Sequence, residues 1–341
     1  MNVTVSFRTL ALPVLTLLLA AAPIRPQSGI APNDIERVGQ SGWQFLKING
    51  DPVLTGIGGV ATAYSPRNAN AVFANPAALN DVVGLDAQFN NVSWIADIRH
   101  QSLAVAWNAG SAGVIAASVV SLDYGDIPET VNAPIAGDAS RTSAVVTGNM
   151  FTANDVAVGL SYARRITDRL SLGGNVRWIQ QKIAELSMSN WSVDFGTMYY
   201  TGFRSLRLAI TARNFGPDAN MVGWSEEYGR EPVDVRMPID FRAGVAMDFF
   251  ENREDAHFLT VVFEGDHPND GPEKFHLGGD YVFQDVLSLR AGYRFNYDEQ
   301  GYSLGAGYIY TYGGFRGVVN YAFLDFGALD NAHFISLGFG L

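Results

Sequence analysis

Pro238-Ile-Asp-Phe-Arg-Ala-Gly-Val-Ala-Met-Asp-Phe249 alternates between apolar residues and polar or small ones. Phe241 and Val245 share one parity, whereas Arg242 has the other. Residues 286–296 repeat this period of two. Because successive side chains of a strand point to opposite faces, the pattern predicts strands with one apolar face and one polar face.

The same period extends over most of the chain from Leu85 onward and divides it into about fourteen strands. The predicted strands are 85–95, 98–108, 113–123, 154–164, 170–182, 189–200, 206–214, 238–249, 257–266, 273–283, 286–296, 302–310, 315–324 and 333–341.

Two classes of β protein fit such strands. In a secreted sandwich the apolar faces meet in a core, whereas in an outer-membrane barrel they face lipid and the polar faces line the lumen. The longest connections, 124–153 and 215–237, follow odd-numbered strands, and those after even-numbered strands are short. Short periplasmic turns opposite long outer loops are typical of outer-membrane barrels. We therefore predict an all-β transmembrane antiparallel barrel in the cell outer membrane, in contact with its lipid.

The two ends of the chain agree with export to that membrane. Arg8 precedes the apolar run 10–22, which ends in Ala20-Ala21-Ala22, and this order is typical of a signal peptide. We predict a signal peptide over 1–28, with cleavage between 22 and 28. At the other end, apolar residues alternate over 335–341, as in a final barrel strand.

Composition excludes several kinds of function. The 341 residues include no Cys, so Cys-based metal sites and thiolate nucleophiles are excluded. A net charge of −11 with no basic cluster argues against nucleic acid. We find no metal-binding spacing among the five His and no catalytic motif, so we predict a non-enzymatic protein with no catalytic residues, no metal and no cofactor.

A second kind of sequence precedes the strands. Residues 56–79, GIGGVATAYSPRNANAVFANPAAL, begin with glycines and contain Ser65-Pro66 and Asn75-Pro76, in which a capping side chain precedes a Pro suited to the first helical position. We expect short helical turns over 67–73 and 77–82, within a hatch that spans 29–83 inside a barrel spanning 84–341. The hatch motif comprises Gly56, Gly58, Gly59, Asn75, Pro76, Ala77 and Leu79. Gly56–Ala61 also fits a dinucleotide fingerprint, but no parallel βαβ pattern surrounds it, so we prefer close packing against the wall.

Charged residues recur on the polar strand face. They are interpreted either as ion pairs that brace the wall or as a selectivity lining for an anionic solute, since interior charges normally occur paired. The predicted lumen-lining charges are Arg177, Asp194, Arg213, Asp240, Arg242, Asp248, Asp280, Arg290, Arg294 and Arg316.

A set of segments spread over the chain carries a family resemblance: 41–48, 56–63, 75–79, 94–97, 122–126, 160–164, 172–175, 194–196 and 214–216. Together they resemble the PorV/PorQ family of outer-membrane barrels, which are themselves similar to FadL hydrophobic-compound transporters. The resemblance implies either type IX secretion, with docking of a translocon subunit or secreted cargo, or FadL-like passive transport of hydrophobic small molecules. Docking is the first hypothesis and transport the alternative.

Two structural features would separate these functions. An apolar pocket under the hatch would favour transport, whereas a lumen crossed by Arg/Asp pairs beneath apolar outer loops would favour docking. The loops 124–153 and 215–237 are rich in apolar residues, and we predict Trp224 and Tyr228 as partner-docking residues.

Overall fold

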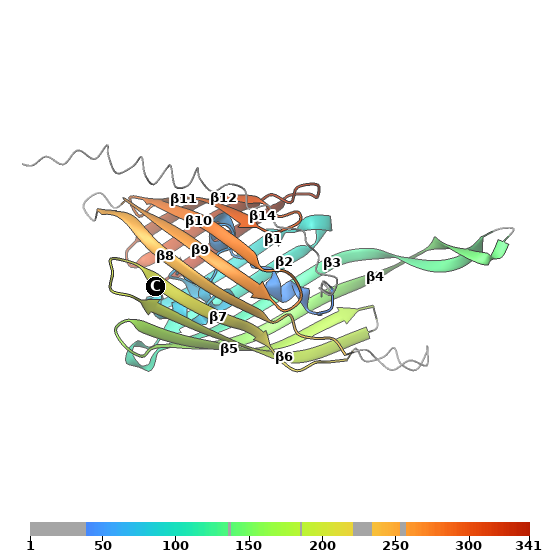
Figure 1. Ribbon diagram of the computed structural model, residues 1–341, viewed down its shortest axis with the longest axis horizontal. Helices are drawn as coiled ribbons and strands as arrows, with labels where there is room; N and C mark the ends of the chain where they lie inside the picture. The colour runs from blue at the N-terminus through green and yellow to red at the C-terminus, as the bar shows by residue number, and fades with distance from the viewer. Residues whose placement is uncertain (1–38, 136–137, 185, 221–233, 253–256) are drawn as a thin grey trace, which may run out of the picture. The chain divides into compact units, whose positions relative to one another are not determined.

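The strands of the computed structural model form one closed antiparallel wall (Figure 1). The structure describes residues 39–135, 138–184, 186–220, 234–252 and 257–341. Strands β1 to β14 follow one another around the barrel, and β14 closes it against β1. The bounds are β1 (Leu85–Ser93), β2 (Arg99–Asn108), β3 (Val114–Ile135), β4 (Asp138–Arg165), β5 (Leu170–Ile183), β6 (Leu186–Tyr200), β7 (Arg207–Phe215), β8 (Asp240–Asn252), β9 (His257–Pro268), β10 (Lys274–Phe283), β11 (Leu287–Phe295), β12 (Tyr302–Tyr312), β13 (Phe315–Leu324) and β14 (Ala332–Gly340).

The two faces of the wall differ as the alternation predicts. On β11, Leu289 is 53% exposed, whereas Arg290 is 8% exposed on the inner face. A closed barrel leaves no backbone edge unpaired, and an outer face of aliphatic and aromatic side chains is suited to lipid. The fourteen-strand outer-membrane barrel predicted from the sequence is confirmed.

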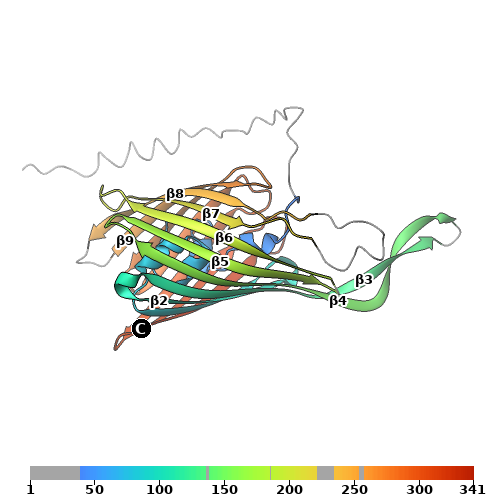
Figure 2. The same ribbon diagram turned by 90° about the horizontal axis from the view of Figure 1, so that it is seen from below.

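The connection 124–153 is not the loop that the sequence analysis expected. The pairing of β3 with β2 ends at Asp123 of β3, and the pairing of β4 with β5 ends at Ala153 of β4. Beyond these two residues β3 and β4 pair with each other as a two-stranded ribbon. Figures 1 and 2 both show this ribbon, the β3–β4 arm, projecting from one end of the barrel. The arm shows only a weak alternation of apolar and polar residues, because neither of its faces packs against lipid or against the lumen.

Short turns lie at the end of the barrel opposite the arm, together with the C-terminus (Figure 2). These turns include the two-residue connection 313–314 between β12 and β13. Short turns mark the periplasmic side of outer-membrane barrels, so the arm projects outward from the cell.

Inside the wall lies the described part of the hatch, which consists of short helical elements. They are η1 (Gln44–Lys47), α2 (Pro52–Gly56), η2 (Ala69–Phe73) and η3 (Pro76–Asp81), and two further 3₁₀ turns, η4 (Ile95–Asp97) and η5 (Gly110–Ala112), connect strands. The N-terminal part of the hatch and the predicted signal peptide lie outside the described residues. Within the described part, no helix is long and apolar enough to cross a membrane.

Local capping determines where the hatch turns begin. Asn75 caps η3, because its Oδ1 accepts a hydrogen bond from Ala77 N at 3.0 Å, and Pro76 occupies the first position. The other expected turn, over 67–73, begins two residues later than predicted. Asn68, not Ser65, caps η2, and Arg67 has φ 55°, outside the right-handed helical range.

The hatch contacts the wall at backbone distance. A Cβ at Gly278 of β10 would lie 2.0 Å from Ile57 O, and one at Gly292 of β11 would lie 2.0 Å from Gly58 N. Glycine is therefore needed at both positions, because any other residue would displace the hatch or the wall. These contacts place the hatch firmly against β10 and β11.

Candidate functional site

The lumen contains the predicted charged residues, and most of them form ion pairs. Arg177 of β5 donates from Nη2 to Asp194 of β6 at 2.6 Å, with both side chains at most 5% exposed. Asp248 of β8 instead pairs with Arg207 of β7, through two hydrogen bonds at 2.7 and 2.9 Å. The sequence analysis missed Arg207, although it is in phase with Arg213 on the polar face of the same strand and this phase could have identified it.

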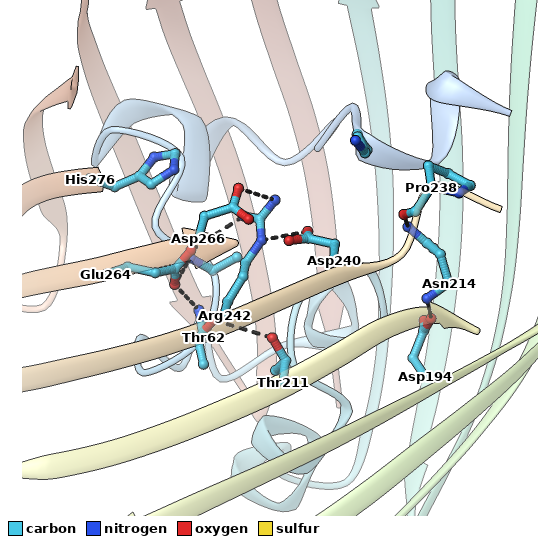
Figure 3. A network of polar contacts seen from close by, with 12 residues as sticks. Thr62, Asp194, Thr211, Asn214, Pro238, Asp240, Arg242, Glu264, Asp266 and His276 are labelled. Atoms are coloured by element: carbon cyan, nitrogen blue, oxygen red, sulfur yellow. Dashed lines mark hydrogen bonds and ion pairs between the residues drawn. The ribbon is translucent and has the colours of Figure 1, made fainter. Parts of the chain in front are cut away.

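The densest part of the network surrounds Arg242 (Figure 3). Its guanidinium lies 2.7 Å from Asp240, 3.3 Å from Glu264 and 3.3 Å from Asp266. Glu264 and Asp266 lie on β9, directly across from Gly244 and Arg242 of β8. The sequence analysis missed both, although they are in phase on the polar face of β9 and this phase could have identified them.

Glu264 also fixes the hatch. Its Oε2 accepts hydrogen bonds from Ala61 N at 2.9 Å and Thr62 N at 2.6 Å, while its Oε1 faces Arg242. Asn75 makes a second link, since its Nδ2 donates to Thr62 O at 2.8 Å and to Thr197 O of β6 at 3.0 Å. The charged network and the hatch are therefore one connected structure.

A third polar group joins the hatch to β10 and β11. Arg290 lies 3.1 Å from Asp280, and the hatch residue Tyr64 donates to the same carboxylate at 2.5 Å. Arg290 Nη1 also donates to Asn320 of β13 at 3.1 Å. This cluster braces the wall at a position where the interior is filled by the hatch.

Three of the predicted arginines form no ion pair with the described residues. They are Arg213 of β7, Arg294 of β11 and Arg316 of β13. Arg213 is 5% exposed and carries a buried Nε without a partner among the described residues. Arg294 donates to Gln300, an uncharged side chain of the outer loop between β11 and β12. The ion-pair interpretation therefore accounts for most, but not all, of the lumen cations.

The hatch motif residues lie at these contacts. Gly56 ends α2, and Gly58 N donates to Ser303 Oγ of β12 at 3.0 Å while Gly58 O accepts from His276 Nδ1 at 2.7 Å. A Cβ at Gly59 would meet the Arg294 guanidinium at 2.9 Å. The remaining motif residues, Pro76, Ala77 and Leu79, are buried in η3.

A pocket of about 220 Å³ remains between the hatch and the outer end of the wall. Its lining comes from η1 and the residues after it, from the outer ends of β8 to β11, and from the loop that contains Tyr297 and Gln300. The lining is mostly charged or amide, and its large apolar residues are Ile48, Trp94 and Phe334. The pocket is thus polar and lies on the outer side of the hatch.

Among the described residues, no group of three or more His, Asp or Glu side chains is placed to hold a metal ion. The predicted docking residues Trp224 and Tyr228 lie outside the described residues.

The fold is shared with solved outer-membrane structures, although no family model and no curated protein matches the chain. The chain is similar to the Pseudomonas putida toluene transporter TodX, at 13% identity over 86% of this chain and 97% of that one, with a TM-score of 0.55. It is also similar to the CymD monoaromatic hydrocarbon channel, at 13% identity over 84% of this chain and 95% of that one, with a TM-score of 0.52. These likenesses show a shared outer-membrane barrel fold; the resemblance to FadL transporters and membership of the PorV/PorQ family stay predictions.

Proposed function

We propose that the protein is a passive outer-membrane transporter that admits small hydrophobic molecules from outside the cell. The observation that carries this proposal is the pocket of about 220 Å³ that remains above a hatch filling the barrel. Pockets of a few hundred cubic ångströms are suited to small ligands. The shared fold with a toluene transporter and a hydrocarbon channel supports the same function.

The lining defines what such a ligand would be. The pocket is not the apolar cavity that the sequence analysis took as the sign of transport, and ion pairs do cross the lumen. The apolar part of a ligand would contact Ile48, Trp94 and Phe334, while the rest meets charged and amide groups. A ligand with one polar end fits this lining better than a pure hydrocarbon does.

A variant that fills the pocket tests the proposal. Gln300 lines the pocket from an outer loop, so Gln300→Trp adds bulk there without altering a strand. Asp298→Trp places the same bulk on an exposed position of that loop. In cells that lack other uptake routes, we expect toluene uptake with the wild type and Asp298→Trp, and none above background with Gln300→Trp. Equal uptake by both variants would contradict passage through this pocket.

A second candidate function, docking of a translocon subunit or secreted cargo, is favoured by the β3–β4 arm. Val131, Val145, Val146 and Met150 of the arm are 46–63% exposed. A two-stranded ribbon is at best marginally stable in water, and clustered exposed apolar side chains are common at protein interfaces. Within the arm, Glu129 accepts from Thr147 at 2.7 Å and from Asn149 at 2.9 Å, which stabilises the pairing.

Removal of the arm separates the two functions. A variant in which residues 127–150 are replaced by a short turn should keep toluene uptake, because the wall and pocket are untouched. If the arm docks a partner, affinity purification from native outer membranes should recover a defined translocon subunit or cargo with the wild type and not with the variant. Loss of uptake with no loss of a partner would contradict docking.

A further inference from the structure

The outer pocket has a charge opposite to that of the whole chain. Four cationic side chains line it, Lys47, Arg242, Lys274 and Arg294, against two acidic ones, Asp240 and Asp266. The lining therefore has a net charge of +2, in a chain whose net charge is −11. Whether the pocket can hold an anion therefore depends on which of these cations are already paired with carboxylates.

Two carboxylates just outside the lining, Asp270 and Glu264, offset this charge in sum, but they pair with Lys47 and Arg242 and leave the other two cations without an ion pair to a described carboxylate. Lys47 forms an ion pair with Asp270, which lies just outside the lining, and Arg242 is surrounded by carboxylates. Arg294 and Lys274 remain. Neither forms an ion pair with a described carboxylate, and the Arg294 Nε has no hydrogen-bond partner among the described residues.

The nearest groups that these two cations contact are uncharged, although Asp266 of β9 lies across from Lys274 in the strand register without forming an ion pair with it. The guanidinium of Arg294 donates to the Gln300 amide, and the Lys274 ammonium lies 4.3 Å from the centre of the Tyr297 ring. Gly59 provides the space beside the guanidinium, as its missing side chain would lie 2.9 Å away. A partly buried guanidinium without a carboxylate is costly unless a ligand or water supplies the acceptor, and its planar fork matches a carboxylate.

An apolar surface lines the same pocket. Trp94 packs edge-on against Phe334 with ring centres 6.1 Å apart, and against Phe326 at 5.0 Å. Phe334 and Phe326 are 1% and 3% exposed, so they hold Trp94 in place, and the partly exposed Trp94 presents the aromatic surface. A cavity of about 150 Å³ is known to hold benzene, and a pocket of 220 Å³ has room for a ring with one added polar group.

We propose that this pocket binds a small organic monoanion that combines a carboxylate with a ring-sized apolar group. The carboxylate lies against Arg294 and Lys274, and the apolar group lies against Trp94, which Phe334 supports. The inference deepens the proposed function by defining the ligand class, but binding itself does not require that the ligand then cross the membrane.

Calorimetric titration of the full-length protein in detergent tests this proposal with benzoate, toluene and inorganic phosphate as probes. We expect benzoate to bind the wild type more tightly than either toluene or phosphate does. Arg294→Gln should weaken benzoate at least about tenfold and leave toluene unchanged, because charge-assisted hydrogen bonds are the strong ones. Arg316→Gln is the matched control, since Arg316 also belongs to the wall but does not line the pocket.

Each alternative result overturns a defined part of the proposal. Benzoate binding that is unchanged by Arg294→Gln would exclude the carboxylate contact. Phosphate binding as tightly as benzoate would exclude the apolar contact. If Arg294→Gln fails to fold, Lys274→Gln replaces it with the same expectation. Tight benzoate binding without uptake by cells would leave this inference intact and refute the proposed transport function.

Discussion

Arg290→Leu probes how the hatch is held, because it removes the cation between Asp280 and Asn320. The two charged side chains are 8% and 2% exposed, and the 3.1 Å contact from Arg290 Nε to Asp280 Oδ1 lacks hydrogen-bond geometry. Without Arg290, the Asp280 carboxylate keeps one hydrogen bond, from Tyr64 at 2.5 Å. A buried carboxylate would then lack a counter-charge.

The magnitudes can be ranked from these contacts. Removing one partner of a buried pair costs about 3–5 kcal/mol, so Arg290→Leu and Asp280→Leu should each lower the free energy of unfolding by that amount. The double variant has no unpaired charge and leaves mainly the Tyr64 hydroxyl without its partner, at a cost of about 1–3 kcal/mol. It should therefore be more stable than either single variant.

Urea unfolding in lipid vesicles measures these free energies, and heat-modifiability on gels checks that each variant inserts. The expected coupling is large, since the double variant should fall several kcal/mol short of the sum of the two single effects. Additive losses would refute the argument, because they would show that the two charges stabilise the barrel independently. The inner-face variant should also still insert, because Arg290 does not face lipid.

Three further predictions follow from other contacts. Leu289, the third residue of β11, faces lipid, so Leu289→Arg should make insertion less favourable by about 2 kcal/mol. Normal insertion, measured by heat-modifiability on gels, would contradict the lipid-facing assignment. Asn75→Ala removes the cap of η3 and the hydrogen bond to Thr197 O, so the permeability of vesicles to small solutes should rise while heat-modifiability stays unchanged. A variant that fails to assemble would show instead that the hatch and the wall fold together. Burial acts to raise the pKa of Asp270, but hydrogen bonds from Lys47, Ser41 and Gln44 outweigh it and hold the pKa below its usual range. The ionised Asp270 thus stabilises the hatch above about pH 4, and this contribution is lost as the pH falls further. Hydrogen exchange in η1 should therefore accelerate in acid for the wild type but not for Asp270→Asn. Equal pH dependence of exchange in the two proteins would contradict this role of Asp270.

Some features of the protein depend only on local sequence, and these could be predicted. A strand with one lipid face and one lumen face must alternate residue by residue, so residues 238–249 indicated a barrel strand without any partner. Capping is equally local, and Asn75-Pro76 marked the start of η3 correctly. The arm escaped prediction because water surrounds both faces of residues 126–135 and 141–152, so no environment imposes an apolar and a polar side there.

Other features required the tertiary structure, because they join residues that are distant in the chain. Alternation placed Arg242 on the polar face but could not show that three carboxylates surround it, since barrel register brings β8 and β9 together. The hatch contacts are more remote still, as Asn75 meets Thr197 and Gly58 meets Ser303. Closure of the wall around the hatch also decided which cations, Arg294 and Lys274, face the outer pocket without an ion pair to a described carboxylate. Side-chain period is a property of one strand, whereas pairing depends on register between strands and on what fills the space they enclose.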